Sequence, residues 1–303
     1  MINYFLKVII LMLISSTVLS QSAPSFIKDF LKVNDVLIVD TYSNEFENIS
    51  DFDGHYIVPQ DHLNSSSHDF ESEIVYSGLF AHRAWMYATN EYIVGRDDNH
   101  RAYPTLQLAL TNLVVVSPLV IIDIYVLYDI DIFDEFEKDW FSIATYTSYS
   151  DNNWFRTQLV NLDHNYRMHL MHVPTQGVSK PTIFQSKVMT MPKKEWVRVT
   201  TMIDYSSTNR FKSPIIAVWQ NGELASASTF VDRINPYNIS PESSPLCLDN
   251  WDGASVESAE LACGLSYEAG LAQVHFGMYA PSGLSSGVVF NDALTINKAK
   301  VIE

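Results

Sequence analysis

Basic residues are scarce in this chain of 303 residues, which holds 19 lysines and arginines against 35 aspartates and glutamates. The formal net charge is −16, and positions 33–82 contain no lysine or arginine at all. Binding to nucleic acid depends on lysine and arginine, because these side chains neutralise phosphates and release counterions. The composition therefore excludes nucleic acid as a partner and makes an anionic membrane surface a poor one.

Long apolar runs are also missing. A membrane-spanning helix needs about 20 consecutive apolar residues, and the run at 114–128 is interrupted by Pro118 and Asp123. At the N-terminus, a short apolar run at 8–14 follows Lys7 and precedes small residues that end at Ser20. This pattern is typical of a cleaved export signal. We therefore predict a signal peptide over residues 1–20, a secreted, extracellular protein and no insertion into a membrane.

Cysteine occurs only twice, as Cys247 and Cys263. In an oxidising compartment this pair predicts a disulfide, and two cysteines without suitably spaced histidines do not predict a zinc site. The segment 231–270 holds both cysteines and lacks strand alternation. We interpret it as a long surface loop within a single domain that spans residues 21–303. Sequons at Asn48, Asn64 and Asn238 are candidate glycosylation sites.

Helical periodicity is confined to residues 25–32, where Phe26, Phe30 and Leu31 can share one face. The rest of the chain is rich in short β-type runs separated by turn residues. An Asn221-Gly222 pair between two such runs predicts a tight antiparallel hairpin. The pattern predicts an all-β protein made of two packed antiparallel sheets with one short N-terminal helix. The clearest predicted strands are 73–76, 105–110, 119–128, 140–149, 196–204, 215–220, 273–280 and 294–301.

Period-two alternation separates two faces on two of these strands. His275 and Tyr279 alternate with Phe276 and Met278, and Gln107 alternates with leucines on an earlier strand. Each strand therefore has one core face and one polar face. Histidine, tyrosine and glutamine on the polar faces favour a ligand-binding surface over an ordinary solvated one.

Three short motifs resemble those of jelly-roll polysaccharide lyases of the alginate and glucuronan lyase type, within the concanavalin A-like superfamily. The motifs are Glu71-Ser72-Glu73, Tyr103-Pro104-Thr105-Leu106-Gln107 and His275-Phe276-Gly277-Met278-Tyr279. The resemblance implies a two-sheet jelly roll that cleaves a uronate-containing polysaccharide by β-elimination. It also implies that Gln107 neutralises the uronate carboxylate and that Tyr279 acts as proton donor or base.

The sequence departs from the motifs of these lyases at two positions. Glu71 stands where the lyases have an arginine, and Ala109 stands where they have a histidine. Other polar residues must then complete the reaction, because β-elimination needs a suppressed carboxylate charge, a base and an acid. The candidate replacements are His82, His100, Arg101, Tyr103 and His275. The candidate substrate-binding residues are Glu73, His169, Trp219 and Gln220.

Two other functions stay open. Asp129, Asp131 and Asp134 resemble in spacing the carboxylates of jelly-roll β-glucanases, which implies a glycoside hydrolase. The same acidic loop, which continues to Asp139, has oxygen ligands suited to a structural calcium ion; we expect no other cofactor. His169 and His172 are three residues apart and would face opposite sides of a strand, so we predict no metal site there. A glycan-binding, lectin-like protein or an extracellular structural protein, without catalysis, is the remaining alternative.

Overall fold

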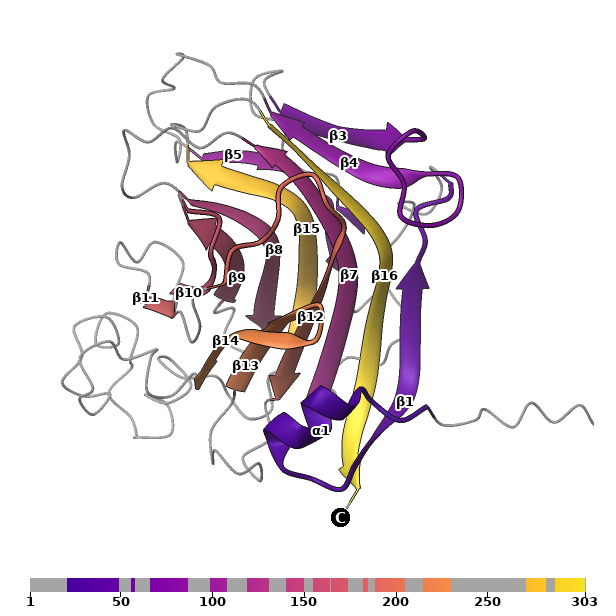
Figure 1. Ribbon diagram of the computed structural model, residues 1–303, viewed down its shortest axis with the longest axis vertical. Coiled ribbons are helices and arrows are strands. Elements are labelled where there is room, and N and C mark those ends of the chain that lie inside the picture. Colours follow the sequence, from indigo (N-terminus) through magenta and orange to yellow (C-terminus); the bar gives the residue numbers. More distant parts are fainter. Residues whose placement is uncertain are drawn as a thin grey trace, which may run out of the picture.

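The protein is a sandwich of two antiparallel β-sheets with one short helix, as predicted (Figure 1). The computed structural model describes residues 21–48, 56–57, 66–86, 99–107, 119–130, 140–149, 155–163, 165–173, 182–184, 189–204, 215–229, 271–281 and 287–302. The signal peptide, the cysteine pair and the loop at 231–270 lie outside the described residues, so these three remain predictions. In the described part, no helix has both the length and the apolar character needed to cross a membrane.

The first sheet has eight strands. Seven of them are neighbours in one continuous order across the sheet, and β1 pairs with the C-terminal part of β16. In spatial order the strands are β14 (Glu223–Thr229), β13 (Ile215–Gln220), β12 (Val197–Asp204), β7 (Leu119–Ile130), β16 (Gly287–Ile302), β4 (Ala81–Met86) and β3 (Ser66–Glu71), with β1 (Asp35–Asn44) beside β16.

The second sheet also has eight strands, and its centre is the pair formed by β8 and β15. In spatial order the strands are β11 (Thr182–Phe184), β10 (Met168–Val173), β9 (Phe155–Asp163), β8 (Trp140–Tyr149), β15 (Leu271–Pro281), β6 (Thr105–Gln107) and β2 (Tyr56–Ile57), with β5 (Asn99–Ala102) also paired to β15.

Strand β7 shows why this sequence builds two hydrophobic layers. Ile122, Ile124 and Val126 face the main core between the sheets, whereas Leu119 and Ile121 face a second cluster on the outer side. A strand covered on both faces reads as a continuous apolar run, and the run at 119–130 has this character. The predicted strand at this position is confirmed.

Helix α1 (Ser25–Leu31) supplies the cover for the outer side, and it lies across the lower end of the first sheet in Figure 1. Ile27 and Leu31 are buried in the outer cluster. The rings of Phe26 and Phe30 lie 5.4 and 5.3 Å from the ring of Trp219. Trp219 is consequently 2% exposed. This burial corrects the prediction that Trp219 contacts a substrate: the indole anchors α1 to the sheet.

The hairpin predicted at Asn221-Gly222 is confirmed. It joins β13 to β14, and both turn residues have positive φ, 50° at Asn221 and 83° at Gly222. The Asn221 side chain also accepts a hydrogen bond from the backbone N–H of Arg198 at 2.9 Å. The turn therefore holds the edge hairpin to the neighbouring strand as well as closing it.

The predicted strand at 73–76 is wrong: β3 ends at Glu71, and an irregular segment, residues 72–80, follows. The Glu71 carboxylate accepts hydrogen bonds from the backbone N–H groups of Ser72 and Glu73, at 2.8 and 2.9 Å. The Asp292 carboxylate accepts those of Tyr76 and Ser77, at 2.8 and 3.0 Å. Because these carboxylates accept hydrogen bonds from the backbone N–H groups of the segment, those groups are satisfied without pairing to another strand.

Candidate functional site

Strand β15 carries the two titratable side chains that the alternation assigned to a polar face. Val274, Phe276 and Met278 are buried in the core between the sheets. His275 and Tyr279 lie on the outer face of the second sheet and are half-buried. The predicted division of this strand into a core face and a polar face is therefore confirmed.

Tyr103 brings these two side chains into one cluster. Its ring lies 4.9 Å from the His275 ring and 5.9 Å from the Tyr279 ring, edge-on to both. On the other side, His275 Nε2 lies 3.4 Å from the Thr147 hydroxyl. We call Tyr103, His275 and Tyr279 the ring cluster. It joins an imidazole and two phenols, which are groups that can exchange protons with a ligand.

The register of the second sheet places further predicted residues at the edge of the ring cluster. Tyr279 stands opposite Arg101 on β5, and Gln273 stands opposite Gln107 on β6. His100 stands opposite Ala280, one position away from the Tyr279 row. For Arg101, Gln107 and His100 the structure describes the backbone position alone.

Gly277 determines how closely β5 approaches β15. Its φ is +118°, and a Cβ atom at this position would lie 2.5 Å from the carbonyl oxygen of Ala102. Only glycine combines that dihedral angle with such a close contact. The glycine between His275 and Tyr279 thus allows β5 to pack against β15, with Arg101 opposite Tyr279.

The same row continues across the sheet beyond Tyr279, through Ser142 on β8, Asn161 on β9 and His169 on β10. Asn161 and His169 are buried, and burial lowers the pKa of the His169 imidazole. Within the described residues, Asn161 Oδ1 and His169 Nε2 have no hydrogen-bond partner. Sequence reasoning named His169 but missed Ser142 and Asn161. Their relation to Tyr279 depends on the pairing of distant strands, for which the sequence carries no local signal.

The structure separates His82 from the ring cluster. His82 lies on β4 of the first sheet, is fully buried, and contacts the rings of Phe46 and Phe276 at 5.8 and 5.2 Å between centroids. Its Nδ1 lies 3.1 Å from Asn291 Nδ2. Burial lowers the pKa of His82 well below its usual range, and His68 lowers it further. His82 is therefore a neutral core residue, which corrects its assignment as a replacement base.

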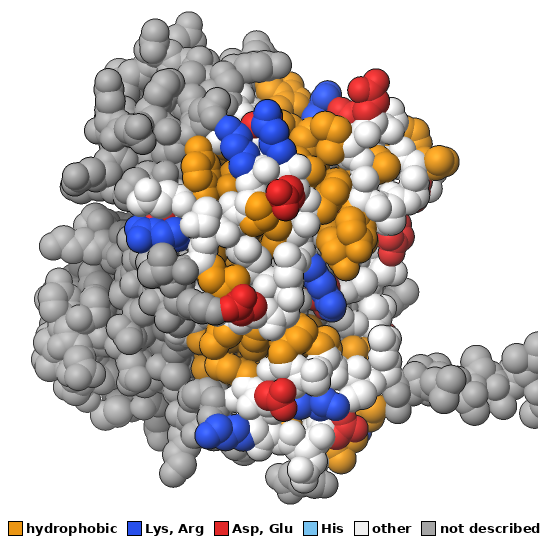
Figure 2. All heavy atoms as spheres, viewed as in Figure 1, with side chains coloured by type: hydrophobic (Ala, Val, Ile, Leu, Met, Phe, Trp, Pro, Cys, Tyr) orange, Lys and Arg blue, Asp and Glu red, His pale blue; other side chains and the backbone are white. Residues whose placement is uncertain are grey.

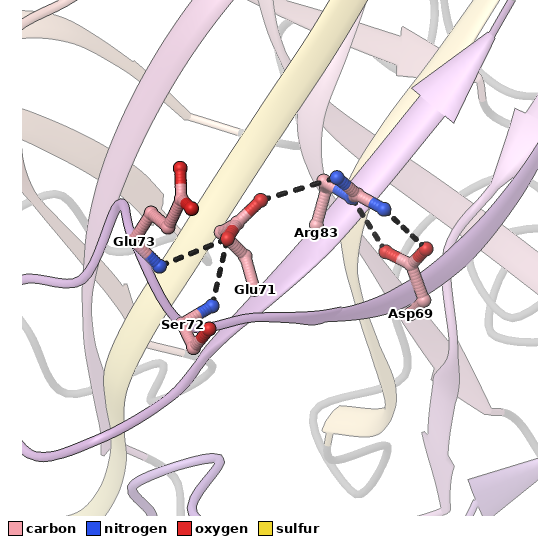
Figure 3. Close-up of polar contacts among 5 residues, drawn as sticks. All are labelled: Asp69, Glu71, Ser72, Glu73 and Arg83. Atoms are coloured by element: carbon pink, nitrogen blue, oxygen red, sulfur yellow. Dashed lines mark hydrogen bonds and ion pairs between the residues drawn. The ribbon is translucent and has the colours of Figure 1, made fainter.

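Gln220 and Glu73 also lie away from the ring cluster. Gln220 is on β13 of the first sheet, is 7% exposed, and donates a hydrogen bond to the Thr190 carbonyl oxygen at 3.4 Å. Glu73 follows β3, where its backbone N–H is held by Glu71 (Figure 3). Both residues were predicted to bind substrate, and the structure brings neither of them to the ring cluster: Gln220 lies in the first sheet and Glu73 just after β3.

Figure 3 shows that Glu71, which replaces the arginine of the lyase motif, is part of an ion-pair network on β3 and β4. Arg83 binds the Asp69 carboxylate through Nε and Nη2, both at 2.6 Å, and the Glu71 carboxylate through Nη1 at 3.1 Å. The hydrogen bond from the Glu73 N–H lowers the pKa of the Glu71 carboxyl, and Arg83 adds to the effect. Glu71 therefore stays ionised and bound within the first sheet.

The aspartates of the hydrolase motif are separated from Tyr279 as well. Asp129 is on β7 of the first sheet, 3.3 Å from Lys193 Nζ and 3.1 Å from Lys194 Nζ. Asp131, Asp134 and Asp139 lie outside the described residues, and so does the calcium prediction for that loop. Among the residues that the structure does describe, no three histidine, cysteine, aspartate or glutamate side chains are grouped to hold a metal ion.

Comparison with known proteins adds information on the fold. No protein-family model and no curated protein matches the sequence of this chain. Among solved structures, it is similar to an endo-β-1,4-glucuronan lyase from the fungus Trichoderma reesei, with a TM-score of 0.52, 12% identity, and coverage of 86% of this chain and 95% of the lyase. It is also similar to the cellulose-induced protein Cip1, with a TM-score of 0.50, 13% identity, and coverage of 84% of this chain and 96% of Cip1. The chain therefore has the two-sheet jelly-roll fold, and a polysaccharide lyase is among its structural neighbours.

Proposed function

We propose that this protein is a secreted polysaccharide lyase that binds a uronate-containing polysaccharide on the outer face of the second sheet. The observation that carries the proposal is the ring cluster, in which Tyr103 contacts both His275 and Tyr279. The jelly-roll fold shared with a glucuronan lyase supports the same substrate class. Fold similarity alone is weak evidence for an activity, so the argument depends on the chemistry of the cluster.

β-Elimination requires a base and an acid from the protein. A base removes the proton from the carbon beside the uronate carboxylate, the C–O bond at the next carbon breaks, and an acid protonates the departing oxygen. The product sugar then contains a new C=C bond. We assign the acid or base role to the Tyr279 phenol, with the His275 imidazole as the second proton-exchanging group.

The carboxylate must also be stabilised, because the intermediate places more negative charge on it. Arg101 stands opposite Tyr279 in the strand register, and Gln107 stands opposite Gln273 two residues before His275. We assign the contact with the carboxylate to these two residues. A local arginine also counters the net charge of −16, because salt screens more distant charges over about 8–10 Å.

The test is a panel of purified uronate-containing and neutral polysaccharides incubated with the secreted protein. Ultraviolet absorbance reports the new C=C bond, and a reducing-end assay reports any chain cleavage. We expect both signals on a uronate polymer, and a loss of about 100-fold or more in the Tyr279→Phe variant. Tyr76→Phe, in the segment at 72–80 away from the ring cluster, is the matched control, and it should retain full activity. Unsaturation that survives Tyr279→Phe would overturn the assigned role of Tyr279.

One observation favours a second function, glycan binding without catalysis. The residues opposite His275 and Gln273 on β8 are Thr145 and Thr147, which supply hydroxyl groups but no acid or base. Saturable binding of a polymer with neither unsaturation nor new reducing ends would establish this alternative. New reducing ends without unsaturation would instead identify a hydrolase and direct attention to the aspartates at 129–134.

A further inference from the structure

A groove of about 640 Å³ lies on the outer face of the first sheet, and the proposed lyase function does not use it. Its lining includes Trp85 of β4, Val288 and Phe290 of β16, and Ile74 of the segment at 72–80. In Figure 2, hydrophobic side chains lie between acidic and basic ones over the region where Figure 1 shows β3, β4 and β16. The groove therefore combines an apolar floor with charged margins.

At each end of the groove, charged side chains are paired with partners of opposite charge. At one end, Arg83 is bound between Asp69 and Glu71 (Figure 3). At the other end, Asp129 is bound by Lys193 and Lys194. Lys193 and Lys194 are not part of the groove lining, but they pair with Asp129, which is. Together the six side chains contribute three negative and three positive charges, so the charges at the groove are balanced although the chain as a whole is strongly acidic.

The register of the sheet sets the length of the groove. Ser67, Trp85, Val288 and Asp129 stand opposite one another in a single row across β3, β4, β16 and β7. Three strand spacings separate the ends of this row, a distance of roughly 14 Å. An elongated floor of this length suits a short stretch of an oligosaccharide better than a single small molecule.

We propose that this groove is a second carbohydrate-binding site and that its ligand is a neutral polysaccharide. The C–H face of a pyranose ring is apolar and packs on aromatic surfaces such as the Trp85 indole. The ring's hydroxyl groups both donate and accept hydrogen bonds. They can donate to the carboxylates of Asp69 and Asp129 and accept from Arg83 without displacing either ion pair.

A charged ligand would not leave these ion pairs intact. A polyanion would compete with Asp69, Glu71 or Asp129 for the basic groups and leave a carboxylate without its partner, which is unfavourable in a partly desolvated site. A divalent cation is not favoured either, because the described residues contain no group of three acidic or histidine ligands. A neutral, polyhydroxylated chain fits both the floor and the margins of the groove.

This site does not depend on the proposed lyase function, because the groove and the ring cluster are on different sheets and face outward from the sandwich. One molecule can therefore hold a neutral polymer on the first sheet while an acidic polymer occupies the second. Such an arrangement would keep the protein attached to a mixed extracellular matrix while its other face acts on the uronate component.

Affinity electrophoresis tests the proposal with the full secreted chain. Soluble neutral polymers (a β-1,4-glucan, a β-1,3-glucan, a xylan and a mannan) are cast separately into native gels, with a uronate polymer for comparison. We expect at least one neutral polymer to retard the protein. Trp85→Ala should weaken that interaction by roughly tenfold or more, as for a central aromatic contact. Phe80→Ala, which removes an aromatic ring that is 37% exposed in the segment at 72–80 and does not line the groove, is the matched control and should bind normally.

A second variant guards against misfolding of Trp85→Ala. Ser67→Arg places a long side chain beside Trp85 from the neighbouring strand β3 and should also abolish retardation, while its thermal melting stays close to that of the parent. Tyr279→Phe should leave binding of the neutral polymer unchanged, which separates this site from the lyase site. Retardation by no neutral polymer would overturn the proposal. So would neutral-polymer binding that both groove variants retain, or binding of the uronate polymer alone through Trp85. Self-association that Trp85→Ala abolishes would instead identify the occupant as a second copy of the chain.

Discussion

The two outer faces of the sandwich use polar residues in opposite ways. On the first sheet, charged side chains are closed into pairs, such as Arg83 with Asp69 and Arg198 with Asp123. On β8 of the second sheet, the residues beside the ring cluster include Thr145 and Thr147, which carry uncharged hydroxyl groups. The same fold thus presents one face with fixed charges and one with proton-exchanging groups.

From this difference we infer that catalysis and carbohydrate binding take place on different faces of the sandwich. The backbone N–H of Glu73 lowers the pKa of the Glu71 carboxyl, and the ion pair with Arg83 lowers it further, so Glu71 is a poor proton donor or acceptor near neutral pH. A histidine beside a threonine hydroxyl has no fixed counter-charge from that neighbour. The second sheet is therefore the better candidate for catalysis and the first sheet for recognition, and the following changes test that division.

The largest effect on stability should come from Trp219→Ala. Trp219 fills the space between α1 and the first sheet, so its removal should lower the free energy of unfolding by about 3–5 kcal/mol. Urea denaturation followed by circular dichroism measures the change. Trp85→Ala, on the same sheet but half-buried in the groove, should lose clearly less stability. Equal losses in the free energy of unfolding would mean that Trp85 contributes as much to stability as Trp219. The proposed difference between a binding tryptophan and a core tryptophan on this sheet would then be wrong.

The next effect concerns the segment at 72–80. The Asp292 carboxylate accepts hydrogen bonds from the N–H groups of Tyr76, Ser77 and Ala293. Asp292→Ala leaves these donors unpaired and should cost about 2–3 kcal/mol. Hydrogen exchange should accelerate at Tyr76 and Ser77 more than in β8 or β15, because only the first sheet holds this segment. Uniform acceleration across both sheets would contradict a local role for Asp292.

A smaller effect should appear on acidification. The pKa of the buried His82 is lowered, so in acid the unfolded chain takes up a proton that the folded chain does not bind. Stability should therefore be unaffected by His82 above about pH 6.5 and should fall as the pH drops below it, by at most about 2 kcal/mol between pH 6.5 and 5. His82→Gln should flatten this part of the profile of unfolding free energy against pH. An unchanged slope would mean that other groups, such as His169, dominate the acid response.

The smallest effect should come from Lys194→Ala. Its ammonium group pairs with Asp129 but the side chain is 66% exposed, and exposed ion pairs contribute about 0–1 kcal/mol. We expect an unfolding free energy within about 0.5 kcal/mol of the parent. Neutral-polymer binding should weaken slightly in this variant, while the proposed lyase activity should stay constant. A loss of that activity would show that the two faces are not independent.

Local patterns in the sequence predicted several elements correctly. Helix α1, the Asn221-Gly222 hairpin and the two faces of β15 all depend on residues close together in the chain. Patterns failed where a strand face was covered by a distant element. Trp219 alternates with the core residue Val218 and so reads as outward-facing, but α1 covers it. For His82, alternation does not distinguish a neutral core imidazole from a catalytic one.

The sequence by itself determined which residues lie on opposite sides of each strand, because side-chain direction follows from the extended backbone alone. It also determined the two-sheet class of the fold, through short β-type runs without helical periodicity. Only the tertiary structure decided which residues come together: the Tyr279 ring lies beside the Tyr103 ring, the backbone of Arg101 stands opposite that of Tyr279, Ser142 to His169 form one row, and Asp129 and Trp85 line the same groove. These arrangements join strands that are far apart in the chain. Their register is set by the packing of whole sheets, which no local pattern contains.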